Sequence, residues 1–113
     1  MAAYEIPNMR FSAEAGATVA RRRFVKINAD EQGVHAGAGE AVVGVSMVDA
    51  DVGEVLEIAN GIVMVEAATA IEAGSEVQSD AYGKAIPLAE GIVAGIALTN
   101  AYGAGSLVSV LIK

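Results

Sequence analysis

Two groups of residues in this chain carry side chains that support catalysis or metal binding in other proteins. His35, the only histidine, could serve as a general base or a metal ligand, but no serine or cysteine nucleophile signature lies near it in the sequence. Asp49, Asp51 and Glu54 approach the pattern of a calcium loop but lack its third acidic or asparagine position, its central glycine and its terminal glutamate. We expect His35 to be an ordinary surface residue and the three acids to be solvated turn residues.

Two glycine pairs have the composition of phosphate-binding loops. Neither Gly37-Ala-Gly39 nor Gly103-Ala-Gly105 is followed by Lys-Ser or Lys-Thr, and neither opens a helical pattern, so we expect both to be loops between strands. A pair of carboxylates among the 14 acids could support glycoside hydrolysis, but aromatics make up only 4% of the chain and offer a poor sugar cleft. We expect no enzyme, no cofactor and no metal site.

Charge is unevenly distributed along the 113 residues. Residues 1–26 carry a net charge of +3 and the rest carry −10, giving −7 overall. The acidic body argues against nucleic acid as a partner. No run approaches the roughly 20 apolar residues of a membrane helix. The start has no basic region followed by an apolar one, so we expect no signal peptide, no membrane association and synthesis in the cytoplasm, which the absence of cysteine also fits.

The elements that must position any site are predicted to be strands, because apolar residues come in short β-branched runs broken by Gly, Asn and Asp. Asn60-Gly61 between two such runs predicts a two-residue hairpin. One helical turn is predicted near 67–73. The predicted strands are Phe24–Ile27, Ala41–Val45, Glu54–Ile58, Ile62–Val65, Ser75–Gln78, Gly91–Leu98 and Ser106–Ile112.

The two halves of the sequence are also similar to each other. Val43–Ala50 is similar to Ala94–Ala101, with Gly44 and Gly95 51 positions apart, and Gly33 in one half is matched with Gly83 in the other. Two such units are too few for a solenoid. The fold class we predict is all-β, a small Gly-rich barrel- or clip-like domain from two similar β units of about 50 residues. A chance similarity between two Gly- and Val-rich stretches is the alternative.

The first residues differ from this pattern. Pro7 and Asn8 interrupt the apolar residues, so we predict an extended N-terminal arm over residues 1–17 and a single β domain over 18–113. A basic arm with aromatic side chains suits binding along a partner, by adding a strand or by filling grooves. The alternative is an edge strand packed on its own domain. Arg21–Arg23 could likewise form a docking segment or a solvated strand edge that resists aggregation.

The order of Gly-punctuated strands resembles a known family. It is similar to the small capsid decoration proteins, or cement proteins, of tailed bacteriophages, over roughly residues 18–113. The segments that carry the resemblance are Arg21–Asn28, Ala41–Ser46, Gly53–Val63, Ala73–Ala85 and Gly91–Leu98.

The resemblance implies a structural virion protein, made in the host cytoplasm, that sits on the outer capsid surface at three-fold and quasi-three-fold positions. It implies a homotrimer that binds the major capsid protein and stabilises its lattice, with no catalytic residues. Members often use the N-terminal segment for contact. The capsid-contact candidates are Tyr4, Ile6, Met9, Arg10, Phe11, Arg21, Arg22 and Arg23.

Two other functions remain open from the sequence. One is a soluble β-clip-like module that binds a ligand or peptide without catalysis. The other is a hydrolase built on carboxylates.

Overall fold

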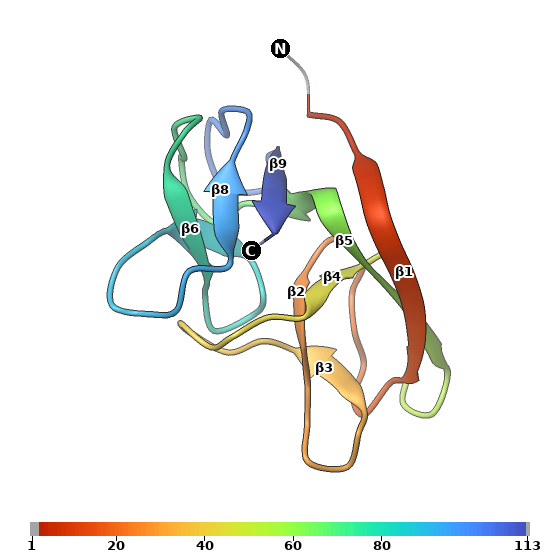
Figure 1. The fold of residues 1–113 in the computed structure, drawn as a ribbon. Helices are drawn as coiled ribbons and strands as arrows, with labels where there is room; N and C mark the ends of the chain where they lie inside the picture. Colours follow the sequence, from red (N-terminus) through yellow and green to blue (C-terminus); the bar gives the residue numbers. More distant parts are fainter. Residues whose placement is uncertain (1–2, 113) are drawn as a thin grey trace.

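The computed structural model describes residues 3–112, and all of their regular elements are β-strands, which confirms the predicted fold class. Among these residues no helix is long and apolar enough to cross a membrane. The sheet order is β3-β2-β4-β5-β9-β8-β6-β7, and β1 pairs with β5 (Figure 1). The strands are β1 (Ile6–Glu14), β2 (Phe24–Ile27), β3 (Gly33–His35), β4 (Gly44–Ser46), β5 (Val55–Glu66), β6 (Glu76–Ser79), β7 (Ala85–Pro87), β8 (Gly95–Ala97) and β9 (Leu107–Ile112).

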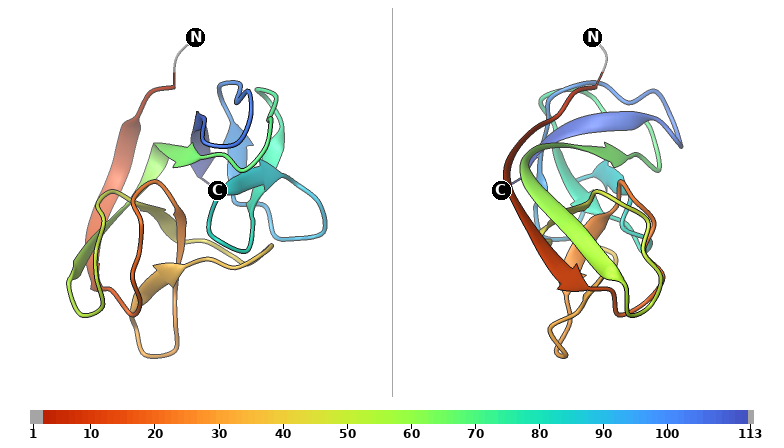
Figure 2. Two further views of the ribbon diagram at one scale, coloured as in Figure 1. Left: turned by 180° about the vertical axis from the view of Figure 1, so that it is seen from behind. Right: turned by 90° about the vertical axis from the view of Figure 1, so that its right-hand side faces the viewer.

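The long strand β5 belongs to two similar units. Its first half pairs with β1 and β4, and its second half pairs with β9. In the right-hand view of Figure 2, β5 lies beside β1 in the lower half of the molecule and beside β9 in the upper half. The first unit (residues 6–60) has the strand order β1-β5-β4-β2-β3, and the second unit (residues 62–112) has β5-β9-β8-β6-β7.

Pairing details repeat at a spacing of 51 or 52 positions, which confirms the predicted internal repeat. Each unit is a curled sheet whose last strand in the order, β3 or β7, comes back to the end of its first strand, β1 or β5. The parallel bridges Ala15–Gly33 and Ala67–Ala85 join these ends. One correspondence drawn from the sequence is wrong. Gly33 is equivalent to Ala85, and the equivalent of Gly83 is Glu31, because both of the latter residues have a positive φ in the same turn.

The two units also repeat their cores. The first unit's core cluster is equivalent, residue by residue, to part of the larger cluster that fills the second unit. The first set is Ala15, Val19, Val25, Ala50, Leu56 and Ile58; the second is Ala67, Ile71, Val77, Ala101, Val108 and Val110. All twelve side chains are at most 3% exposed, so each half of the chain buries its own set of small and β-branched residues.

Gly44 and Gly95 are equivalent because both lie directly against the neighbouring strand. A Cβ on Gly44 would lie 2.5 Å from the carbonyl oxygen of Ala59, and one on Gly95 would lie 2.2 Å from that of Leu111. Real Cβ atoms do not approach backbone this closely, so only glycine fits at either position. This close packing of β4 on β5, and of β8 on β9, explains the repeated glycine seen in the sequence.

The second unit is closed by the first. Phe24, Val45 and Ala59 lie on the outer face of the first unit and are fully buried within the second unit's core cluster. The first unit fills this part of its own interior with larger residues, Leu56 and Ile58, where the second unit has Val108 and Val110. A Cβ on Gly33 would lie 2.7 Å from Leu56, so glycine makes the room that this larger side chain needs.

The predicted hairpin at Asn60-Gly61 is wrong, because β5 runs through both residues without turning. Gly61 has a φ of +98°, yet this conformation serves an irregularity in the β1–β5 pairing rather than a turn. The register shifts between Pro7 and Met9, opposite Asn60 and Gly61, which leaves Asn8 as the extra residue of a bulge.

Other predicted elements differ in extent. The helical turn near 67–73 is absent, since these residues form two bridges and bends. The strands predicted over 41–45 and 91–98 are reduced to β4 and β8. Most of the predicted arm is strand β1, which pairs with β5 from Ile6 to Glu14. The N-terminal segment is therefore an edge strand packed on its own domain, which was the alternative to a free arm. A boundary at residue 17 between an arm and a domain stays a prediction.

Candidate functional site

His35 has a structural contact rather than a partner for catalysis. Its Nε2 accepts a hydrogen bond from the backbone N–H of Ala20 at 3.0 Å. Burial lowers the pKa of His35, and the nearby charge of Arg23 lowers it further, so the imidazole is held neutral as an acceptor. The side chain ties β3 to the segment between β1 and β2. Within residues 3–112, no group of three His, Cys, Asp or Glu gathers that could hold a metal ion.

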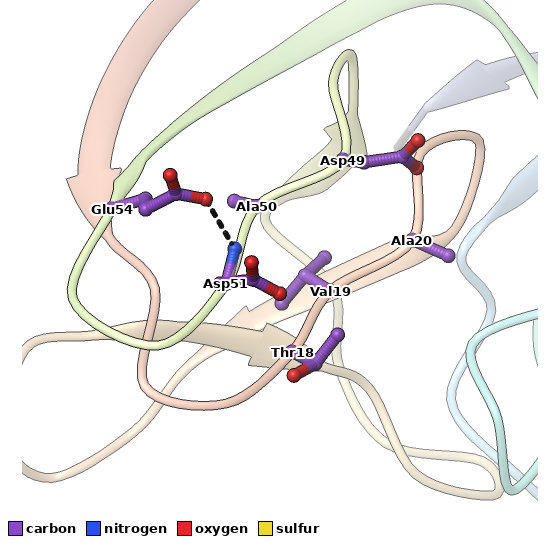
Figure 3. A pocket seen from close by; sticks show the side chains of 7 residues that line it. All are labelled: Thr18, Val19, Ala20, Asp49, Ala50, Asp51 and Glu54. Atoms are coloured by element: carbon purple, nitrogen blue, oxygen red, sulfur yellow. Dashed lines mark hydrogen bonds between the residues drawn. The ribbon is translucent and has the colours of Figure 1, made fainter.

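The acids that resemble a calcium loop line a shallow hollow of about 210 Å³, together with Thr18, Val19, Ala20 and Ala50 (Figure 3). Glu54 Oε1 accepts a hydrogen bond from the backbone N–H of Asp51 at 2.7 Å. Asp49 Oδ1 accepts one from the backbone N–H of Arg21 at 2.8 Å. Glu54 therefore fixes the turn at residues 51–54, and Asp49 holds the segment at Arg21. The three carboxylates do not converge on one point in Figure 3, so they do not form a shared binding site.

The glycine pairs lie in loops between strands, as predicted. Gly39 precedes β4 and contacts Gly91, and Gly105 turns the chain into β9 with a φ of +88°. The N–H of Gly105 donates to the carbonyl of Ala67 at 2.9 Å, and its equivalent, Gly53, donates to that of Ala15 at 2.8 Å. These N–H groups hold the loops to the sheet rather than forming an anion cradle.

The arginines proposed as capsid contacts divide into two kinds. Arg22 pairs with Glu5, and Arg23 pairs with Glu66 at 3.5 Å and also donates to the carbonyl oxygen of Tyr82. Both side chains are more than three-quarters buried. Arg21 is exposed and forms no ion pair with any described residue. The run of three therefore presents one free charge to solvent, while the other two hold the chain together.

The β1 candidates also divide, by how far their side chains are exposed. Ile6 and Met9 are 62% and 55% exposed, and Arg10 is exposed while pairing with Glu57 at 2.6 Å. Phe11 is half-buried against the first unit's core. The segment before β1 is fixed by Tyr4, whose N–H and carbonyl both bond the hydroxyl of Ser109 at 2.6 Å.

The outer edge of β1 has no strand paired with it among the described residues. In the second unit the equivalent edge of β5 is covered: the N–H of Met64 donates to Glu5 Oε1 at 3.1 Å, and that of Glu66 donates to the carbonyl of Arg22 at 2.9 Å. Ser12 and Glu14 occupy the equivalent positions in β1 and are exposed. An extended segment of another chain could add to this edge. The sequence signal for this edge was obscured by Pro7 and the bulge at Asn8.

Comparison with known proteins places the chain. A family model described as phage cement protein matches residues 5–112. The chain belongs to the phage cement protein family. The fold is similar to that of "head fiber gp8.5 N base in bacteriophage phi29", with a TM-score of 0.77, 24% sequence identity and 93% coverage of each chain. No curated protein matches the sequence.

Membership in the phage cement protein family makes this chain a structural protein associated with a phage virion. The match begins at residue 5, so it includes β1, which the resemblance drawn from the sequence did not cover.

Proposed function

We propose that this cement protein binds the outer surface of a phage head at three-fold and quasi-three-fold positions and stabilises the lattice of the major capsid protein, acting as a homotrimer. The family match over residues 5–112 carries this proposal. A cement protein stabilises a shell by adding buried apolar area across the seams between capsid subunits, at roughly 25 cal/mol per Å² before association costs. Modest affinity per copy suffices when one trimer engages several subunits, because the later contacts are effectively intramolecular.

The contact surface in this proposal is centred on β1. Its outer edge has no strand paired with it among the described residues, and the side chains of Ile6, Met9 and Arg10 on this strand are exposed. Arg21 adds a free positive charge, which suits an acidic patch on the shell. In this proposal Phe11 and Arg22 do not touch the capsid but hold β1 in place. Phe11 anchors β1 to the core, and the ion pair of Arg22 with Glu5 fixes the segment that leads into it.

Co-sedimentation with expanded, undecorated heads of the cognate phage tests the proposal. We expect saturable binding, at a copy number matching the three-fold positions, and a higher temperature of head disruption. Absence of co-sedimentation, or binding without any gain in head stability, would contradict it. Binding at another copy number would contradict the three-fold placement.

The two kinds of arginine supply a matched pair of variants. Arg21→Gln should weaken binding to heads, more strongly at low salt where screening is weak, and leave stability unchanged. Arg22→Gln should instead lower the free energy of unfolding by about 1 kcal/mol, because it leaves the carboxylate of Glu5, whose side chain is 17% exposed, without its cationic partner. If Arg21→Gln binds heads as wild type does at every salt concentration, Arg21 is not a contact.

A further inference from the structure

The outer faces of the two units carry equivalent rows of residues. In the first unit, pairing across β2, β4 and β5 aligns Phe24, Val45 and Ala59. In the second unit, pairing across β6, β8 and β9 aligns the equivalents Glu76, Ile96 and Leu111. The second row continues through Ile62 of β5 to Ile6 of β1. We call Ile62, Ile96 and Leu111 the outer row.

The two rows differ in what covers them. Phe24, Val45 and Ala59 are fully buried beneath the second unit. In the outer row, Leu111 is 41% exposed, and Ile62 and Ile96 are partly exposed. At two of the three aligned positions the second unit carries the larger apolar side chain, with Leu111 in place of Ala59 and Ile96 in place of Val45, whereas Glu76 stands in place of Phe24. Nothing within the described chain buries them completely.

The chain itself shows what such a face can bind. The first unit's row is covered by another β unit of the same architecture, so this surface already serves as a contact between units. The outer row contains no charged residue, although the chain carries a net charge of −7. Two copies would repel each other over most of their acidic surface. They can approach most closely where acids are few, and on this face one exposed acid, Glu76, is paired directly with Ile96 at the end of the row.

We propose that the outer row is the contact surface for a second copy of this chain. The number of copies rests on the trimer proposed above, but the surface does not depend on attachment to a head. Burial of an uncharged apolar row between like chains is a common basis of stable oligomers.

The test measures the mass of the full chain in solution by sedimentation at a series of concentrations, without heads. We expect wild type to self-associate and Leu111→Glu to raise the dissociation constant about tenfold or more. The matched control is Ile92→Glu, a loop residue that is 56% exposed and outside the row, which should associate as wild type does. A wild-type monomer at every concentration overturns the proposal. An oligomer unaffected by Leu111→Glu also overturns it, while leaving the trimer intact.

A second measurement covers the case in which Leu111→Glu fails to fold. The chain has no cysteine, so Leu111→Cys and Ile92→Cys each introduce a single thiol. We expect maleimide to label the thiol at position 111 more slowly as protein concentration rises into the association range, and the thiol at 92 at a constant rate. Equal behaviour of both thiols overturns the proposal. If position 111 is protected only when heads are added, the shell covers the outer row, and the second copy is excluded.

Discussion

Gly39 and Gly91, in the loops that lead into β4 and β8, meet backbone to backbone. A Cβ on Gly91 would lie 2.2 Å from the Cα of Gly39. The buried side chain of Gln78 holds the same loop, because its Oε1 accepts the N–H groups of Ala89 and Gly91 at 2.8 and 2.9 Å. The two units therefore meet here through their backbones.

Replacing Gly91 by alanine should destabilise the whole domain. The new methyl group would press on the backbone of Gly39, which cannot give way as a flexible side chain can, so we expect the free energy of unfolding to fall by about 2 kcal/mol. Urea unfolding measures this. Gly103→Ala is the control, since a Cβ there meets nothing within 4 Å, and it should stay within about 0.5 kcal/mol of wild type. Equal stability of both variants would show that the Gly39–Gly91 contact is not tight.

Glu31→Gly should stabilise the protein. Glu31 has a φ of +65°, and its equivalent in the second unit is Gly83 with a φ of +78°. Both turns are held by one side-chain oxygen, that of Asn28 or Asp80, which accepts two backbone N–H groups. Relief of the left-handed strain is worth about 1 kcal/mol, measurable as a higher unfolding midpoint. Glu31→Ala, which removes the charge but keeps the Cβ, should not stabilise. A gain in that variant would assign the effect to charge.

His35 should make the protein less stable in mild acid. Its pKa in the folded chain is lowered from 6.5 by burial and by Arg23. Well above pH 6.5, His35 is neutral in both the folded and the unfolded chain. As the pH falls through 6.5, the imidazole is protonated in the unfolded chain before it is protonated in the folded chain. The free energy of unfolding therefore decreases as the pH drops from 6.5 through the lower pKa of the folded chain. Unfolding midpoints measured between about pH 7 and 5 should show this decline in wild type, and a smaller one in His35→Gln, which cannot titrate. Parallel profiles would rule out His35 as the cause.

Phe11 and Met9 should separate folding from attachment. Phe11→Ala removes a side chain packed against the first unit's core and should cost about 2 kcal/mol of stability. Met9→Ala changes an exposed side chain of the same strand, so stability should hold while binding to heads weakens. Urea unfolding and head co-sedimentation together give both quantities. Loss of stability in Met9→Ala, or weak binding with full stability in Phe11→Ala, would reverse the assigned roles.

The fold class and the repeat could be predicted because they depend on patterns that recur. Phe24–Ile27 forms β2 with the predicted bounds, and the glycine shared by the two halves marks the same close approach in both. The short strands β3 and β7 were not predicted. Each has three residues, too few for an alternating pattern, and each is defined by pairing with its neighbour.

The sequence predictions were wrong where the same local residues are compatible with two different structures. Asn60-Gly61 favours positive φ, which serves a hairpin or a bulge equally well, and only the position of β1 across from it decides. Pro7 argued against a strand at the N-terminus, yet it lies at an edge, where proline is tolerated. The burial of Arg22 and Arg23 depends on Glu5 and Glu66, far away in sequence, so no local pattern could separate them from Arg21.

The shared strand β5 has a mechanical consequence. β1 flanks one half of it and β9 the other, both antiparallel to it. A pull applied to β1 and β9 along the strand direction is therefore carried through one continuous backbone, and the hydrogen bonds on each side are loaded in shear, many at a time, instead of being unzipped one by one. If one neighbouring protein is bound at β1 and another at β9, a force that pulls them apart acts along the direction in which this domain resists unfolding most.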